Sequence, residues 1–305
     1  METIVQRACG LAVHQASITG CMMRQGIKQQ IECFGTTPSE LERLRDWLHS
    51  HQITHVAMES TGGYWKPVFN IIGEDFELLL VNARHVKHVP GRKTDVADSQ
   101  WLCKLLRAGL LQGSFIPKAE IRELRNLTRY QKKLQHQLQS EKSRVHKILQ
   151  EANINLTSVL SDIFGVAGFH ILEDLARGIT NPIRLSEHFA RDKRLKAKQT
   201  AAEEALNGRV TPHHQFMLTT LLGHIRFLQA QIADIEAQVA QRIEAHQQEH
   251  ELLQTLPGIK VRAANTIIAE IGTDMDQFPD EKHLASWAGL CPGNHESAGK
   301  KKAQS

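Results

Sequence analysis

The pattern of apolar and polar positions divides the chain into two parts that meet near residue 117. Short apolar runs separated by glycines open the first part, at Cys9–Val13, Ile18–Met23 and Ile31–Phe34. Glycine-containing turns between short apolar runs are typical of hairpins. We therefore expect three strands in an antiparallel meander.

Helices and strands then alternate. Thr37, followed by a proline and with Glu40 three residues later, indicates the start of a helix that a leucine repeat carries to about His51. The apolar runs Ile53–Met58 and Phe76–Asn82 predict buried strands, with a further helix between them. Three strands, helix, strand, helix, strand is the order of a ribonuclease-H fold, so we predict an α/β ribonuclease-H-like (RuvC-like) domain over residues 1–117.

The second part has helical periodicity. Apolar residues keep approximate heptad spacing over Glu120–Leu149 and keep it more regularly over Leu218–Val239. We predict that these two long helices pair as an antiparallel coiled coil in a helical region, residues 118–250, with a small helical insertion at 157–212. A small helical C-terminal domain is expected over residues 251–305.

Composition indicates a soluble protein, and the distribution of its basic residues, more than its net charge, favours a nucleic-acid partner. The chain has 305 residues, 41% of them hydrophobic and 23% charged, and no apolar run reaches the length of about 18 residues that a membrane span needs. With no signal segment at its start, we expect a cytoplasmic location. Five scattered cysteines indicate reduced thiols and not a disulfide framework or a zinc ribbon. The net charge is only +4. Basic residues nevertheless gather at Arg84–Lys93, Arg122–Lys147, Arg191–Lys198 and Lys300–Lys302.

Three carboxylates stand where they could hold a metal ion. Glu59 follows a buried strand. The apolar pattern predicts a helix over Thr94–Leu111, in which Asp95 and Asp98 lie three apart and project from one side. Ordinary alternatives exist for each: an acidic residue often begins a turn, and an acidic pair beside Arg92 and Lys93 is often a solvated helix start. A strand-end glutamate followed by a helical aspartate pair, within a ribonuclease-H order, favours divalent-metal phosphodiester chemistry.

Six motifs together resemble a known family. They are Gly10-Leu11-Ala12-Val13-His14, Met58-Glu59-Ser60-Thr61-Gly62, Lys93-Thr94-Asp95-Val96-Ala97-Asp98, Leu256-Pro257-Gly258-Ile259, Ala288-Gly289-Leu290-Cys291-Pro292 and Glu296-Ser297-Ala298-Gly299-Lys300. The chain resembles the DEDD transposases of insertion sequences and the related Piv-type invertases, the group that includes bridge-RNA-guided recombinases. The resemblance covers nearly the whole chain.

The resemblance implies a site. Glu59, Asp95 and Asp98 would be ligands of Mg²⁺, and Ser297 would be the nucleophile. The family's first aspartate is replaced here by Ala12, which has no ligand atom. We interpret Ala12 as a deliberate inactivating substitution, because the other motifs are intact; a decayed copy is the alternative. Since relatives continue through a further basic stretch, the resemblance also implies a native chain longer than this one.

The implied activity is cleavage and exchange of DNA strands through a phosphoserine intermediate. Donor and target DNA would be the substrates, and a structured bridge RNA would select them. The resemblance further implies a homo-oligomer, a dimer or tetramer, in a bacterial cytoplasm and associated with the nucleoid. Because the nucleophile and the carboxylates lie in different domains, the active site is expected to assemble between subunits.

Two other functions fit the same residues. A metal-dependent junction nuclease would use water in place of Ser297, and a noncatalytic nucleic-acid scaffold would explain Ala12. The turn at Leu256–Ile259 is either a helix-hairpin-helix that binds phosphate or an ordinary turn between helices. His14, His295 and the pair His213-His214 lack ligand spacing and are interpreted as surface or phosphate contacts.

Overall fold

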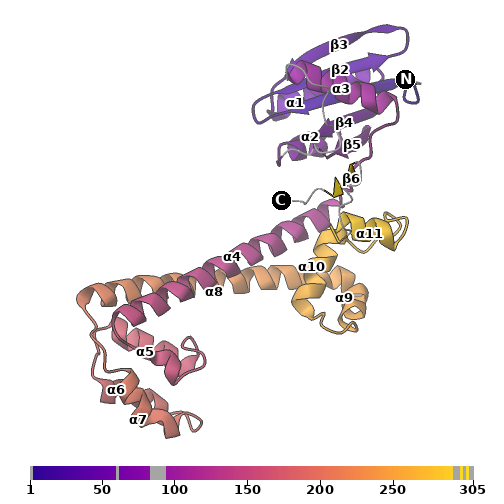
Figure 1. Cartoon of the computed structure of the whole chain (residues 1–305). Helices are drawn as coiled ribbons and strands as arrows, with labels where there is room; N and C mark the ends of the chain where they lie inside the picture. Colours follow the sequence, from indigo (N-terminus) through magenta and orange to yellow (C-terminus); the bar gives the residue numbers. More distant parts are fainter. Residues whose placement is uncertain (1–2, 60–61, 83–93, 291–295, 298–299, 302–305) are drawn as a thin grey trace. The chain divides into compact units, whose positions relative to one another are not determined.

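The computed structural model describes residues 3–59, 62–82, 94–290, 296–297 and 300–301, and only the backbone of the last four. The chain divides into two compact units, Met1–Ile116 and Pro117–Ser305 (Figure 1). No helix among the described residues is long and apolar enough to span a membrane.

The first unit is built on a mixed five-stranded sheet of order β3-β2-β1-β4-β5. The strands are β1 (Arg7–Val13), β2 (Ile18–Arg24), β3 (Ile27–Phe34), β4 (His55–Glu59) and β5 (Glu77–Val81). The first three are antiparallel neighbours, whereas β4 runs parallel to β1 and β5 runs parallel to β4. The expected meander and the two later strands are therefore present, in an α/β unit.

Helices cover both faces of this sheet. Helices α1 (Pro38–Ser50) and α2 (Trp65–Ile72) pack on one face, against Leu11, Ile18 and Met58. Helix α3 (Asp95–Arg107) packs on the other, against Ala8, Cys21 and Ala57. Because side chains alternate along a strand, odd-numbered positions of β1 face α1 and α2, and even-numbered positions face α3.

Two local details differ from the sequence pattern. The third strand begins at Ile27, earlier than expected. Its pairing with β2 extends over polar residues, which give no apolar signal in the sequence. At the start of α1, Thr37 makes no side-chain cap, and the Glu40 carboxylate accepts a hydrogen bond from the Gly35 amide and contacts Arg43. The helix start is thus correct, although a capping box does not form.

Gly10 lets α3 lie directly on β1. A Cβ atom at this position would stand 2.3 Å from the Ser99 carbonyl oxygen and 2.5 Å from the Cys103 nitrogen, both backbone atoms that cannot rotate away. The close approach explains why a small residue is required in the centre of this strand. It also fixes which sheet face α3 covers.

We expect Gly10→Ala to lower the free energy of unfolding of the first unit by about 3 kcal/mol, the upper range for overpacking a core. Trp47, Trp65 and Trp101 lie in this unit and Trp287 in the other, so tryptophan fluorescence in urea follows mainly the first unit. Gly63→Ala is the control, since a Cβ there meets nothing within 4 Å. Equal stability of the two variants would contradict the proposed packing.

The second unit is helical, and two long helices form its frame. Helices α4 (Ala119–Glu151) and α8 (Pro212–Ile243) pack against each other along their length (Figure 1). The start of α4 shares a core with the end of α8, through Leu124 and Val239, and the end of α4 shares another with the start of α8, through Ile148 and Leu218. The two helices are therefore antiparallel.

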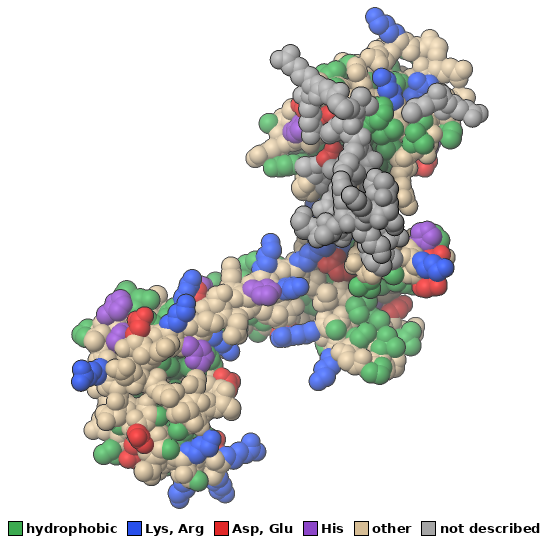
Figure 2. Space-filling model, in the orientation of Figure 1, with side chains coloured by type: hydrophobic (Ala, Val, Ile, Leu, Met, Phe, Trp, Pro, Cys, Tyr) green, Lys and Arg blue, Asp and Glu red, His purple; other side chains and the backbone are tan. Residues whose placement is uncertain are grey.

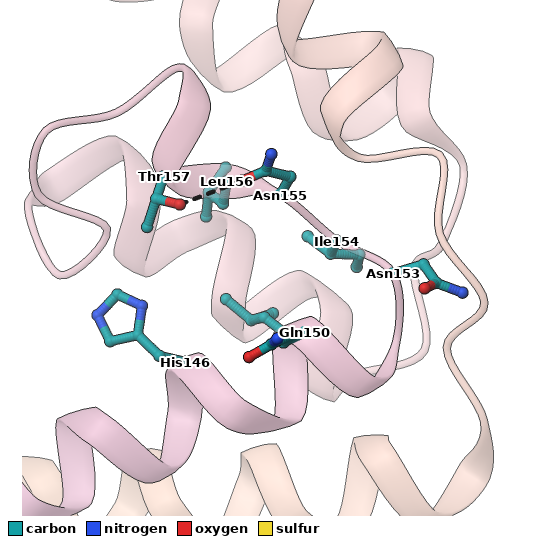
Figure 3. Close-up of a pocket in the computed structure, with 8 residues that line it drawn as sticks. His146, Gln150, Asn153, Ile154, Asn155, Leu156 and Thr157 are labelled. Atoms are coloured by element: carbon teal, nitrogen blue, oxygen red, sulfur yellow. Dashed lines mark hydrogen bonds between the residues drawn. The ribbon is translucent and has the colours of Figure 1, made fainter.

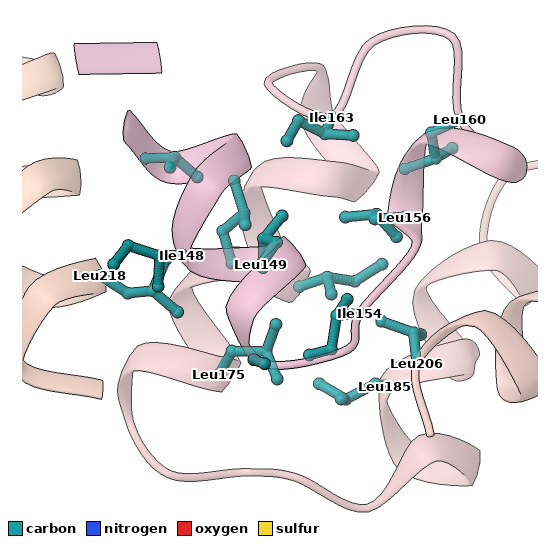
Figure 4. Close-up of a cluster of buried hydrophobic side chains, with 14 of the residues drawn as sticks. Ile148, Leu149, Ile154, Leu156, Leu160, Ile163, Leu175, Leu185, Leu206 and Leu218 are labelled. Atoms are coloured by element: carbon teal, nitrogen blue, oxygen red, sulfur yellow. The ribbon is translucent and has the colours of Figure 1, made fainter. Parts of the chain in front are cut away.

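Three shorter helices fill the connection between them. They are α5 (Val166–Ala176), α6 (Pro182–Ala190) and α7 (Gln199–Ala205), with single turns η1 (Leu156–Ser158) and η2 (Lys196–Lys198). Their apolar side chains complete a core around Phe189, Leu172 and Leu206, the largest apolar cluster among the residues that the structure describes. Figure 4 shows this cluster between α4, the following loop and α8.

The remaining helices follow the turn η3 (Glu244–His246) and are α9 (Gln247–Gln254), α10 (Val261–Ile271) and α11 (Glu281–Trp287). Of these, α10 packs against the start of α4, and α9 packs against α10. The Arg125 guanidinium donates to the carbonyl oxygens of Ala269 and Glu270, at 3.1 and 2.6 Å, and so anchors the end of α10 to α4. A short hairpin follows, of β6 (Glu296–Ser297) and β7 (Lys300–Lys301).

Candidate functional site

Position 12 lies at the end of β1 on the face covered by α3. Ala12 is two residues beyond Gly10, whose missing Cβ would meet α3, so that both side chains project from the same face. Ala12 pairs with Thr19 of β2 and is buried. Its methyl group supplies no ligand atom to this end of the sheet.

Glu59 is the last residue of β4, the parallel neighbour of β1. It pairs with Val81 of β5 and lies two residues beyond Ala57, which packs in the same cluster as α3. By strand alternation its side chain projects from the α3 face too. In the parallel register Gly10 pairs with Ala57, and continuing the register by two residues sets position 12 opposite Glu59.

Asp95 and Asp98 occupy the first turn of α3. Thr94 is the N-cap, and its hydroxyl accepts a hydrogen bond from the Ala97 amide, which fixes where the helix begins. Acidic side chains in a first turn are stabilised by the helix dipole. This helix start and the ends of β1 and β4 thus belong to the same unit and the same sheet face.

His14, which the sequence indicated only as a surface or phosphate contact, is a neighbour of this site. It follows β1 directly, and its Nε2 atom lies 3.0 Å from Asp95 Oδ1, with both side chains about half exposed. The contact joins the end of β1 to the start of α3. The sequence signal that could have placed His14 here is its spacing of two residues from Ala12, because residues two apart along an extended strand project to the same side.

The donor set fits a hard divalent cation in type but is incomplete. Carboxylate oxygens are the ligands that Mg²⁺ prefers, and Glu59, Asp95 and Asp98 supply them. Among the described residues, however, no group of three or more His, Cys, Asp or Glu side chains is gathered closely enough to hold a metal ion. Ala12 contributes nothing, and the Asp95 carboxylate is paired with His14.

Cys103 lies on the same helix but is not a candidate ligand. The pKa of the Cys103 thiol is raised well above its usual range, mainly by its hydrogen bond with Cys21 and secondly by burial. A thiol must lose its proton to bind a metal or act as a nucleophile. Cys103 therefore stays protonated and serves to pack α3 on the sheet.

Ser297 lies in β6, in the second unit, and pairs through its backbone with Lys300 of β7.

The turn before α10 contains Gly258 with φ of +88°, a conformation that favours glycine. His295, Cys291, Lys302 and the basic cluster Arg84–Lys93 lie outside the described residues. The structure thus describes the backbone of the proposed nucleophile and leaves the two interpretations of the Leu256–Ile259 turn open.

Basic side chains are spread over the helical unit, as Figure 2 shows. Helix α4 carries the largest group of them: Arg122, Arg125, Arg129, Lys132, Lys133, Lys142, Arg144 and Lys147. Some of these charges are paired within the protein, as in the two contacts of 2.7 Å that Arg129 makes with the Glu270 carboxylate. Others, such as Lys132 and Lys133, are exposed. Exposed cations along a helix suit contacts with a phosphate backbone.

A mixed five-stranded sheet of this order, with carboxylates at a strand end and at the start of the covering helix, is consistent with the ribonuclease-H-like class of nucleic-acid enzymes. Residues 9–154 match the transposase family of the DEDD IS110 type, and residues 250–305 match the family described as Transposase IS116/IS110/IS902. The chain belongs to this family of insertion-sequence transposases and is a DNA transposase by that membership.

One curated relative agrees with the family assignment. A probable family 20 transposase of Pseudomonas aeruginosa is 23% identical over 263 residues, which cover 85% of this chain and 68% of the relative. The resemblance inferred from the motifs is therefore confirmed at the level of the family.

Proposed function

We propose that this transposase cleaves and exchanges DNA strands with Ser297 as its nucleophile and with Glu59, Asp95 and Asp98 as its metal-binding carboxylates. The observation that carries the proposal is the common sheet face of position 12, Glu59 and the start of α3. Strand cleavage with an aspartate at position 12, and a covalent protein–DNA adduct that requires Ser297, test it.

The carboxylates of Glu59, Asp95 and Asp98 would hold Mg²⁺, one ligand short because of Ala12. When bound, the ion would polarise the scissile phosphate and stabilise the charge that develops on it. The protein's part is to hold these oxygens in a fixed arrangement on the α3 face. A site with one ligand missing holds the cation less firmly, so we propose that this chain is catalytically impaired.

The covalent step belongs to Ser297. Its Oγ atom forms a bond to phosphorus while the bond from phosphorus to the departing strand's oxygen breaks, and the hydroxyl proton is taken up by that oxygen by way of solvent. A hydroxyl of another strand then attacks the phosphoserine and returns the proton to Oγ. The energy of the phosphodiester bond is conserved, so no co-reactant is required.

Further proposals concern partners and location. Ser297 and the carboxylates lie in different units. This supports an active site shared between subunits of a dimer or tetramer, held together by the α4–α8 pair acting as a coiled coil. We propose that a structured bridge RNA selects donor and target DNA, with basic residues contacting its backbone. The location proposed is the bacterial cytoplasm, in association with the nucleoid.

Ala12 also supports a second candidate, a noncatalytic scaffold that binds nucleic acid without cutting it. The missing ligand atom at position 12 favours this candidate. The two functions share the binding surface and differ in chemistry. Restoring the carboxylate at position 12 separates them.

Binding to DNA should not depend on position 12 and should weaken steeply with salt. A protein that contacts 6–10 phosphates loses roughly 10³–10⁵-fold in affinity between about 50 and 200 mM salt. We expect a loss in this range for the chain as it stands and the same curve for Ala12→Asp, measured by fluorescence anisotropy on duplex DNA. A flat salt dependence would contradict the role of the basic residues.

A further inference from the structure

A cavity of about 510 Å³ opens in the helical unit where α4 ends. Its lining residues, drawn in Figure 3, combine exposed polar side chains with buried aliphatic ones. The eight lining residues are His146, Leu149, Gln150, Asn153, Ile154, Asn155, Leu156 and Thr157. No charged carboxylate, ammonium or guanidinium group is among them.

Backbone hydrogen bonds hold the walls of this cavity in place. The Asn155 amide donates to the Ala205 carbonyl at 3.0 Å, and the Arg209 amide donates to the Ala152 carbonyl at 2.7 Å, so that the loop is fastened to the end of α7 and the segment after it. Asn153 takes φ of +56°, a conformation that asparagine tolerates. The cavity is therefore preformed, which lowers the entropy cost of binding.

The lining indicates the chemistry of a ligand. Carboxamides offer one donor and one acceptor side by side, the pattern that matches the edge of a nucleobase, adenine in particular. The floor of Leu149, Ile154 and Leu156 is buried and apolar and suits a flat ring face. Within the described part of the chain the Gln150 carboxamide makes no hydrogen bond to the protein, so it is available to a ligand.

Positive charge stands beside the cavity and not inside it. The Lys142 ammonium lies 4.9 Å from the Phe164 ring centroid, and that ring meets the His146 ring edge-on at 5.6 Å. Lys147 is exposed on the next position of α4. An uncharged cavity with cations at its side suits a nucleotide whose base enters and whose phosphate stays outside.

We propose that this cavity binds an unpaired nucleobase of a single-stranded nucleic acid. The inference rests on the proposed action on nucleic acid, and it adds a base-binding site far along the chain from Glu59, Asp95, Asp98 and Ser297. Base contact here anchors a single strand, or a base turned out of a helix, on the helical insertion. The strand is either RNA or DNA.

The test compares two variants that change charge equally on the same helix. Gln150→Glu replaces a donor inside the cavity by a charged acceptor, and Gln139→Glu makes the same change at an exposed position outside it. Both proteins are titrated with fluorescein-labelled 12-nucleotide single strands, oligo(rA) and oligo(dA), with circular dichroism as the check of folding. Because one good base contact is lost, Gln150→Glu is expected to bind the single strands about ten-fold more weakly than the unaltered chain. The affinity of Gln139→Glu should stay within about two-fold of that of the unaltered chain.

A second measurement locates the base. A single strand that carries 4-thiouridine should crosslink to the peptide 146–157 in the unaltered chain. Tighter binding of oligo(rA) than oligo(dA) would identify RNA as the source, and the reverse would identify DNA. Equal affinities of the two variants, or crosslinks only outside the peptide 146–157, would contradict base binding in this cavity and leave the proposed function intact. A protein that binds neither single strands nor duplex DNA overturns both.

Discussion

Replacing Ala12 by aspartate is expected to raise the rate of Mg²⁺-dependent DNA cleavage by more than about 100-fold, because losing even an outer partner of a metal ligand costs about 10–100-fold. The side chain at position 12 lies on the α3 face, opposite Glu59 in the continued register of β1 and β4. A carboxylate there would join Glu59, Asp95 and Asp98. Cleavage is measured on duplex DNA in single-turnover conditions, with the other components of the reaction held constant.

Ala12→Asn is the matched control for this substitution. Asparagine has nearly the same size but no negative charge, so it fills the same space without completing the carboxylate set. Position 12 is only 6% exposed, and an unpaired carboxylate there destabilises the fold. Mg²⁺ should therefore raise the melting temperature of Ala12→Asp more than that of Ala12→Asn. Equal cleavage rates of the unaltered chain and Ala12→Asp would contradict the assignment of Glu59, Asp95 and Asp98 as metal ligands beside position 12.

The sheet could be predicted from sequence because its core strands are short apolar runs. Ile18–Met23 and Ile53–Met58 stand out in the pattern, and the strands lie within a residue or two of them. The third strand was predicted too short, since Lys28, Gln29 and Gln30 carry no apolar signal. Those residues extend the strand only because β2 offers backbone partners.

The carboxylate site was accessible from sequence only in part. Strand alternation and the helix start indicated Glu59, Asp95 and Asp98, whereas Ser297 had no physical signal in its own segment and rested on the resemblance. The contact of His14 with Asp95 joins residues 81 positions apart, and no local pattern reports such a distance. The roles of all four site residues remain predictions.

The cavity beside α4 could not be predicted, because it depends on how the chain turns after the helix. Asn153 adopts a left-handed conformation, and the loop is then fastened to the segment after α7. In the sequence, Asn153–Thr157 resembles any polar helix end. The helical insertion between the long helices was expected, but its walls depend on contacts between segments about 50 residues apart.

Ser297→Ala is expected to abolish the covalent adduct between protein and DNA in the Ala12→Asp background. Only an oxygen nucleophile at this position can form a phosphoserine, and the substitution removes that single atom. Denaturing gels of reactions on labelled DNA should show protein shifted by attached DNA for Ala12→Asp, and no shift after Ser297→Ala. DNA affinity should change less than about two-fold, because basic residues elsewhere supply the phosphate contacts.

A serine outside the site supplies the control for this loss. Ser286 is exposed on α11 in the same unit, so Ser286→Ala should leave the adduct unchanged. The two mechanisms then give opposite results, because a water-using nuclease cuts DNA without ever joining it to protein. Cleavage that continues at full rate in Ser297→Ala, with no adduct in either protein, would reject the serine mechanism and favour the nuclease. Loss of both adduct and cleavage in Ser297→Ala alone would assign the nucleophile.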